Sequence, residues 1–381
     1  MLVAQPLSLA RDKQATATIV QTFEYLYAYR TAQADSALRT LAPKWSNYPG
    51  YLLVDALIDY WRYMPISLYG REYDKYKATV GRAAQLAEKM LERNPADYEA
   101  TFFCMMAYTV LARQASEDGD NLKAVGYAKD AFKHLKSGFD LQAKYPDFYF
   151  STGLYKYYRI RYPEDHQIYK PFLSFFPDGN KADGLHNLEI AADKGLFSKT
   201  EATMFLTFIN LRYENKPERG LAFAQQLVRR YPSNPAFRVL LSEALLLNDK
   251  REEVPTHAGY AARFPSPLVK AGAEAMLGWY YEREGDRAKA AALYQDALKR
   301  VERVPKQADN VKSICLAGQA RLAAYQGKRH VAKQLYRDVL GFTNHTVLRE
   351  EARRYLRRLD EEGNRVKRKE YLKNQANAST P

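Results

Sequence analysis

Apolar residues recur at helical spacing along most of the chain, and the clearest case is LGWYYEREGDRAKAAALYQDAL, residues 277–298. Leu277 and Tyr281 stand four residues apart and therefore share one face of a helix. Gly285 suits the left-handed conformation in which helices commonly end, and Asp286 can cap the helix that follows. This pattern predicts two helices joined by a tight turn.

The second helix of this stretch carries small residues on the face that meets the first helix. The stripe consists of Ala290, Tyr294 and Ala297, and we expect Ala290 to seat against Gly278, which has no side chain to hold a neighbour away. The spacing Leu-Gly-x2-Tyr-x3-Gly-x4-Ala-x3-Tyr-x2-Ala resembles that of a tetratricopeptide repeat over one unit of about 34 residues. The resemblance implies a helical hairpin that stacks on further hairpins.

Less regular copies of this spacing recur in residues 37–49, 215–232 and 327–339. In the second of these, Asn215 stands at the expected left-handed turn and Pro217 starts the next helix. No run of alternating apolar residues predicts a strand. We predict an all-α fold, a tetratricopeptide-like right-handed superhelix of stacked helical hairpins, which is an α-solenoid. Prolines that separate the predicted helices stand at positions 49, 95, 146, 232 and 265.

The rhythm of the repeats divides the chain into four parts. Residues 1–11 are a disordered or residual signal segment, because Ser8-Leu9-Ala10 places small residues where a signal peptidase reads, without a basic start. If this segment is the end of an export signal, the protein is periplasmic or envelope-associated; otherwise it is cytoplasmic. The other parts are a divergent helical-repeat block with an atypical middle (12–200), a C-terminal tetratricopeptide block (201–361) and a basic polar tail (362–381).

Composition excludes two classes of architecture. No stretch has the roughly 18 uncharged apolar residues that a membrane-spanning helix needs, so we predict no transmembrane helix. The two cysteines, Cys104 and Cys315, lie in apolar runs, and we predict that they are small core residues. No disulfide framework is expected.

Residues 145–176 interrupt the repeats and hold seven of the 30 tyrosines. Tyr157 and Tyr158 continue a helical pattern that we expect Pro163 to end, and a new helix is expected after Gly179. Two interpretations of the tyrosines stay open. They are core and interhelix residues, as aromatic residues at helical spacing usually are, or they form the wall of a peptide-binding groove.

This segment also resembles a known family. The pattern Phe150-x2-Gly153-Leu154-Tyr155, then Pro163, then Phe176-Pro177-x-Gly179-x4-Gly184-Leu185 is similar to the central segment of the inclusion body clearance family of tetratricopeptide proteins. The similarity covers roughly 100 residues and implies architecture only, so no functional residue is carried over.

Motifs of catalysis and metal binding are absent from the sequence. There is no Cys-x2-Cys, no Gly-x-Ser-x-Gly, no phosphate-binding glycine loop and no His-Glu-x2-His, and the six histidines are scattered. We therefore predict a protein that is not an enzyme and has no catalytic residues, no cofactor, no metal site and no small-molecule substrate. An enzyme built on the atypical middle stays a third class, and it would need a metal or cofactor.

The C-terminal stretch, residues 348–375, has ten basic residues against six acidic ones, and residues 151–381 supply +13 of the net charge of +14. Leu348 and Ala352 begin an apolar stripe that would cap the last repeat. Glu350 and Glu351 stand three or four residues before Arg354, so part of the charge should be paired along the helix. Two interpretations of this stretch stay open. It is a solvated helix that caps the last repeat, or it contacts phosphate groups of lipid or nucleic acid. The basic patch comprises Arg353, Arg354, Arg357, Arg358, Arg365, Lys367, Arg368 and Lys369.

These observations favour a non-enzymatic scaffold or adaptor that binds a peptide or helix of a protein partner on the concave face of the solenoid. The alternative is an electrostatic binder of nucleic acid or of an anionic membrane surface through the basic C-terminal half. Of these two, a peripheral membrane contact fits better than nucleic acid, because aromatic residues are sparse in the basic stretch. The candidate partner-binding residues are Tyr155, Tyr158, Glu274, Tyr280 and Arg283.

Overall fold

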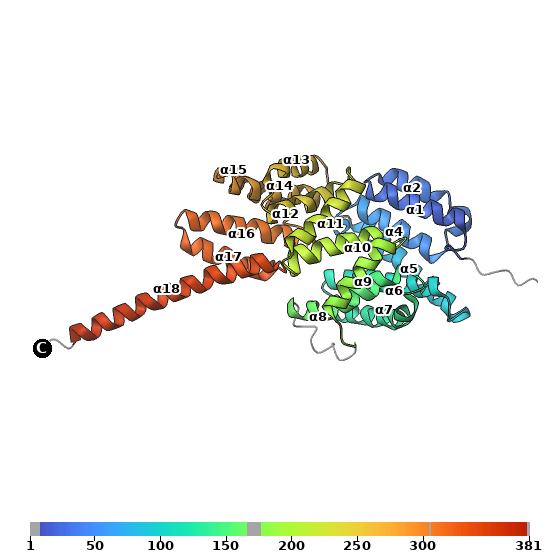
Figure 1. The fold of residues 1–381 in the computed structure, drawn as a ribbon, viewed down its shortest axis with the longest axis horizontal. Coiled ribbons are helices and arrows are strands. Elements are labelled where there is room, and N and C mark those ends of the chain that lie inside the picture. Colours follow the sequence, from blue (N-terminus) through green and yellow to red (C-terminus); the bar gives the residue numbers. More distant parts are fainter. Residues whose placement is uncertain (1–7, 166–176, 305, 379–381) are drawn as a thin grey trace, which may run out of the picture.

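The computed structural model describes residues 8–165, 177–304 and 306–378, and these residues form helices without a strand (Figure 1). The helices of the first half are α1 (Lys13–Tyr27), α2 (Thr31–Arg39), α3 (Ala42–Trp45), α4 (Pro49–Arg62), α5 (Gly70–Arg93), α6 (Tyr98–Glu117), α7 (Asn121–Leu141), α8 (Phe148–Asp165) and α9 (Lys181–Lys194). Those of the second half are α10 (Lys199–Phe208), α11 (Pro217–Arg230), α12 (Pro235–Leu247), α13 (Val254–Ala261), α14 (Pro267–Arg283), α15 (Arg287–Arg300), α16 (Asp309–Tyr325), α17 (Arg329–Phe342) and α18 (Thr346–Ala378). Short helical segments are η1 (Ile66–Leu68), η3 (Ile209–Tyr213, a π-helix), η4 (Arg251–Glu253) and η5 (Lys306–Ala308).

Consecutive helices pack against each other as hairpins, and each hairpin packs against the next. The pairs are α1–α2, α4–α5, α6–α7, α8–α9, α10–α11, α12–α13, α14–α15 and α16–α17, and α18 closes the series on α16 and α17. The predicted α-solenoid of stacked helical hairpins is confirmed. No helix among the described residues is long and apolar enough to span a membrane.

The turns within the hairpins form as the spacing predicts. Gly285, Gly327 and Asn215 all have positive φ, at 86°, 72° and 50°. The carboxylate of Asp286 accepts a hydrogen bond from the backbone N–H of Lys289 at 3.1 Å, which caps α15. These turns fix the antiparallel arrangement of each helix pair.

The glycines of the clearest repeat and of the next one pack against a tyrosine ring. Gly278 faces the ring of Tyr294, since a Cβ atom added to Gly278 would lie 2.8 Å from Tyr294 Cδ1. Gly318 of α16 faces the opposite side of the same ring. Tyr294 is fully buried and its hydroxyl donates to Glu282 Oε2 at 2.7 Å. The two glycines therefore make room for one tyrosine ring between three helices, which an alanine contact would not require.

The expectation that Pro163 ends its helix is wrong. Pro163 lies inside α8, which continues to Asp165. A proline lacks a backbone N–H, so α8 lacks one helical hydrogen bond at this position and continues without it. Residues 166–176 lie outside the described residues. The new helix after Gly179 is confirmed as α9, with Leu188 fully buried.

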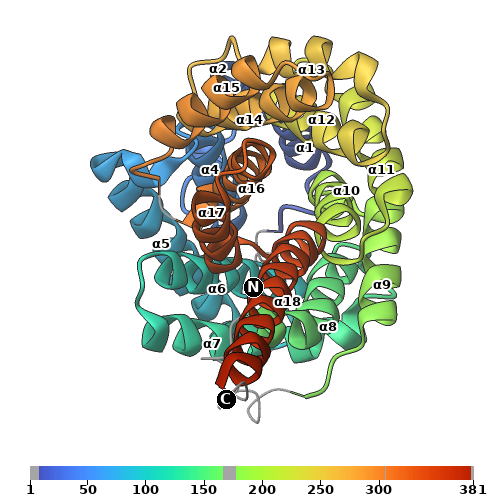
Figure 2. The same ribbon diagram turned by 90° about the vertical axis from the view of Figure 1, so that its left-hand side faces the viewer.

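The solenoid closes on itself. In Figure 2 the helices from α4 to α15 follow one another around a ring. At the closure, Asn234 Nδ2 donates to the backbone oxygen of Tyr27 at 2.9 Å, and Ser266 Oγ donates to that of Met64 at 2.6 Å. The rings of Trp61, Tyr231 and Phe237 pack around Tyr27, with centroids 5.6–6.4 Å away. Much of the high tyrosine content thus serves contacts between helices.

The described start of the chain is packed onto the ring. Leu9 is buried, and its backbone N–H donates to Glu99 Oε2 at 2.9 Å. Ser8 Oγ and Tyr48 Oη donate to the same carboxylate. Ser8-Leu9-Ala10, part of the expected disordered or signal segment, is therefore held by Glu99; residues 1–7 lie outside the described residues.

Candidate functional site

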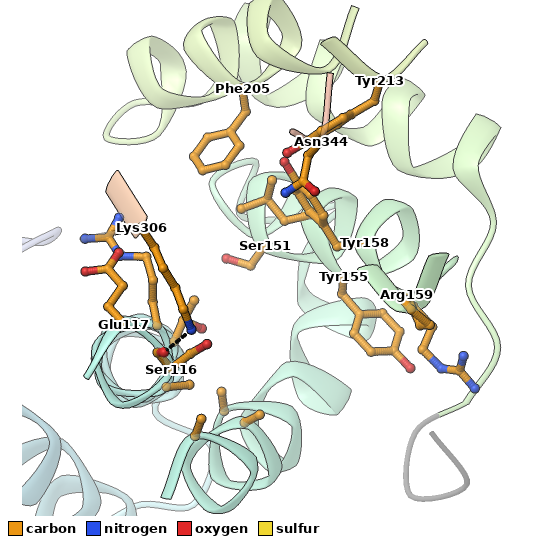
Figure 3. A pocket seen from close by; sticks show the side chains of 18 of the residues that line it. Ser116, Glu117, Ser151, Tyr155, Tyr158, Arg159, Phe205, Tyr213, Lys306 and Asn344 are labelled. Carbon is orange, nitrogen blue, oxygen red and sulfur yellow. Dashed lines mark hydrogen bonds and ion pairs between the residues drawn. The ribbon is translucent and has the colours of Figure 1, made fainter. Parts of the chain in front are cut away.

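A cavity of about 750 Å³ lies on the concave side of the solenoid (Figure 3). Its walls come from α6, α7, α8, α10 with η3, the start of α16 with η5, and the junction of α17 and α18. Both halves of the chain therefore contribute to it, and the ring must form before the cavity exists.

Most of the cavity wall is apolar. Helices α6 and α7 supply methionines, alanines and one phenylalanine, while α8 and α10 add aromatic side chains. In Figure 3, Phe205 extends from α10 toward Ser151 and Tyr158 of α8. Ser151 is half-buried, with its hydroxyl 3.8 Å from Met106 Sδ, so the polar contribution of this wall is small. The apolar members are Met105, Met106, Ala112, Ala124, Val125, Ala128, Ala131, Phe132, Leu135, Phe150, Leu154, Pro163, Phe205 and Phe342.

A polar edge joins η5 to the end of α6. Lys306 Nζ donates to the backbone oxygen of Ser116 at 2.6 Å, as Figure 3 shows. Gln307 Nε2 donates to Glu117 Oε2 at 2.7 Å, and its amide oxygen accepts from Ser67 Oγ at 2.8 Å. These bonds link residues about 190 or more positions apart and hold this wall in place.

Tyr155 and Tyr158 both line the cavity, as the groove interpretation requires. The Tyr155 hydroxyl donates to the backbone oxygen of Pro177 at 2.5 Å, and the Tyr158 ring packs near Phe205 with centroids 6.5 Å apart. Burial raises the pKa of both hydroxyls, so each stays neutral at neutral pH. Their neighbour Tyr157 is fully buried, so the tyrosine cluster contains both core residues and wall residues.

The other three candidate partner-binding residues do not line this cavity. Glu274, a candidate for contact with a partner, is instead buried and paired with Arg300 through two contacts of 2.8 and 3.0 Å. A buried carboxylate needs such a partner because desolvation of its charge is costly. Tyr280 is half-buried, and Arg283 is exposed with Asp249 at 3.8 Å.

His345 is the imidazole of the described cavity wall, and it lies beside a buried ion pair. Arg212 Nη2 and Glu243 Oε2 are 2.6 Å apart, and His345 Nε2 lies 3.7 Å from Glu243 Oε1. Neither ring nitrogen of His345 has a hydrogen-bond partner among the described residues. Burial, which is the main cause, and the charge of Arg212 lower the pKa of His345 to about 4, against the opposing effect of Glu243. At neutral pH the imidazole of His345 is therefore uncharged.

The basic patch lies on α18, whose far half extends away from the ring (Figure 1). Arg353, Arg354, Arg357 and Arg358 are exposed, and none of them has an ion pair among the described residues. The expected pairing of Glu351 with Arg354 is wrong, because Glu351 binds Arg321 of α16 at 3.1 Å. Arg365 and Lys369 are also exposed on α18; the side chains of Lys367 and Arg368 are not described.

The apolar stripe of α18 packs as predicted. Leu348 and Ala352 are buried, and Tyr355 packs against Tyr336 with ring centroids 4.7 Å apart. Asp360 pairs with Lys333 at 3.3 Å. Acidic side chains of α18 therefore turn toward α16 and α17, which leaves the arginines on the outer face.

Sequence reasoning missed most of the cavity wall. Phe205, Lys306 and His345 come from segments far apart in the chain, and no local spacing connects them. Helical periodicity places each of them on a helix or turn, but only the closure of the ring brings them together.

No model of a known protein family matches the chain, and no curated protein matches it. The resemblance of the central segment to the inclusion body clearance family therefore stays a prediction. Among solved structures, the crystal structure of the yeast Tom70 is similar, with 11% sequence identity and a TM-score of 0.41 over 93% of this chain and 84% of that one. A likeness at this level carries no information on partners. The stacked hairpins and their turns make this chain a tetratricopeptide-like helical-repeat protein.

Proposed function

We propose that the protein is a non-enzymatic scaffold that takes an apolar segment of a partner protein, an extended peptide or a helix, into the concave cavity. The observation that carries the proposal is the cavity itself, which offers apolar side chains and two half-buried tyrosines on the inner face of a repeat protein. Concave faces of solenoids are the surfaces that such proteins commonly use for binding.

The chemistry of the wall indicates what the partner presents. Burial of apolar surface contributes about 25 cal/mol per Å², so methionine, alanine and phenylalanine walls favour apolar side chains. Tyr155 and Tyr158 add rigid contact area, because a tyrosine loses little conformational entropy when it is ordered.

The test places a photo-crosslinking amino acid at Ser151, inside the cavity, and at Leu122, which is 78% exposed and outside it. Extracts of the native cell should yield one or a few protein adducts from position 151 and none of these from position 122. Ala128→Phe, which fills the cavity from α7, should abolish the adducts, whereas Leu122→Phe should not. Adducts that survive Ala128→Phe, or a small molecule that copurifies in place of a protein, would contradict the proposal.

A second candidate is electrostatic contact of α18 with an anionic membrane surface. It rests on the unpaired, exposed arginines, while Tyr355 is packed against Tyr336 and so is unsuited to stack on nucleic acid bases. Vesicles with phosphatidylserine should bind the protein and release it as salt rises. Replacement of the four exposed arginines of α18 by glutamine should remove binding; they are Arg353, Arg354, Arg357 and Arg358. A control variant loses the same charge through glutamine at four basic positions that are exposed elsewhere, and its binding should change little. These positions are Lys13, Arg71, Lys89 and Arg93. Equal loss in both variants, or binding to nucleic acid only, would overturn this candidate.

A further inference from the structure

Three potential metal ligands meet outside the cavity, on three successive helices. Glu88 comes from α5, Cys104 from α6 and His134 from α7. One carboxylate oxygen, the thiol sulfur and one ring nitrogen all lie within 4.8 Å of one another. His134 Nε2 is 2.9 Å from Glu88 Oε1. None of the three residues lines the concave cavity, so this cluster is separate from the proposed binding surface.

The cluster is buried but has an open side. Cys104 is fully buried and His134 is 5% exposed, whereas 29% of the Glu88 side chain is exposed. An ion could therefore enter past Glu88 and lose most of its water inside. Burial of this kind gives the ligand atoms fixed directions, because each stands on a packed helix.

Tyr108 packs against one of the three ligands from one turn further along α6. Its ring lies parallel to that of His134, with centroids 6.0 Å apart and planes at 3°. Such outer partners commonly orient the groups that bind a metal.

The donor set selects a class of ion. Zn²⁺ and Co²⁺ bind thiolate, imidazole and carboxylate at about 2.0–2.3 Å, which leaves neighbouring ligand atoms about 3.3–3.8 Å apart in a tetrahedral site. Side-chain shifts of about 1 Å bring the cluster to these distances. We propose that Glu88, Cys104 and His134 bind one divalent transition-metal ion, with Zn²⁺ as the favoured ion and a fourth position left for water.

Binding requires one proton to leave. The Cys104 thiol loses its proton to solvent when its sulfur bonds to the ion. His134 Nε2 gives up its contact with Glu88, and the proton shared in that contact moves through solvent to Nδ1 of the same ring, so that the lone pair of Nε2 bonds to the metal and no second proton is released. Because the thiol proton must leave when the ion binds, affinity should rise with pH.

The test is a Co²⁺ titration of the full-length protein after treatment with a chelator. The wild type should bind one equivalent, with a thiolate-to-cobalt charge-transfer band and visible bands of tetrahedral intensity, and Zn²⁺ should remove these bands. Cys104→Ala should abolish the charge-transfer band, and His134→Gln should weaken binding at least about tenfold.

The chain provides a matched control in Cys315, which is equally buried but belongs to no such group of ligands among the described residues. Cys315→Ala should keep the full spectrum. Far-ultraviolet circular dichroism establishes that each variant is folded, and if Cys104→Ala is not, Cys104→Ser and Glu88→Gln carry the same test. Absence of a band in the wild type, or an unchanged band in a folded Cys104 variant, would overturn the proposal.

Discussion

The contact around Tyr294 and the wall of the concave cavity show two ways in which the same helical hairpins meet. Between α14, α15 and α16, two glycines admit one tyrosine ring, and Arg321 joins Glu282 and Glu351 at 2.6–3.1 Å. Between α6, α8 and α10, bulky methionine and aromatic side chains line the faces, and about 750 Å³ stays unfilled. Small residues at fixed steps therefore give close packing, and where large ones replace them the helices leave a space for something else.

The acid stability of the cavity region is the largest effect expected from this difference. His345 has a pKa of about 4 when folded, against an ordinary value of 6.5. Below about pH 6.5 His345 is protonated in the unfolded chain, whereas in the folded chain it stays neutral until about pH 4. The free energy of unfolding should therefore fall by about 3 kcal/mol as the pH drops across this range. Urea unfolding at several pH values measures it.

The control for this prediction is His345→Gln, which removes the titrating group. Glu201 acts in the opposite direction, because burial raises its pKa to about 8 and folding then favours its protonated form. The difference between the wild type and His345→Gln isolates the histidine. If the difference in free energy of unfolding between the two proteins stays constant from pH 7 to pH 4, His345 takes up its proton in the folded chain as readily as in the unfolded one, and the prediction is wrong.

The next effect is expected at the close contact. Gly318→Ala should lower the free energy of unfolding by about 2 kcal/mol, because the added methyl group collides with the Tyr294 ring. Gly126→Ala in α7, where nothing lies within 4 Å of the added atom, should raise it by up to about 1 kcal/mol through helix propensity. Denaturant unfolding compares the two, and equal effects would remove the distinction between the regions.

The smallest effect is expected for filling the cavity. Ser151→Leu should change the free energy of unfolding by less than about 0.5 kcal/mol, since the larger side chain enters unfilled space and loses only a weak contact with Met106. The same denaturation measurement applies. A loss of 2 kcal/mol or more would mean that this wall is packed as tightly as the surroundings of Tyr294.

The sequence predicts the two regions unequally. The turns can be predicted because they depend on the local chemistry of single residues. As expected, Gly285 and Asn215 have positive φ, and Asp286 caps the helix that follows. The ion pairs of Glu274 and Glu351 could not be predicted, since their partners Arg300 and Arg321 lie 26 and 30 residues away on other helices. The cavity and the cluster of Glu88, Cys104 and His134 likewise depend on which helix faces meet, which the spacing within one helix does not determine.

The closure of the ring at Tyr27 has a kinetic consequence. Its backbone oxygen meets Asn234, 207 residues later, so this contact is among the most distant in sequence that the fold contains. An open solenoid can grow from any repeat by adding neighbours, whereas a closed one has a step that waits for the two distant segments that meet at the closure. During synthesis at about 5–20 residues per second, the aromatic surface around Tyr27 should stay uncovered for roughly 10–40 s until α12 leaves the ribosome. That interval is when we expect chaperones to be needed most.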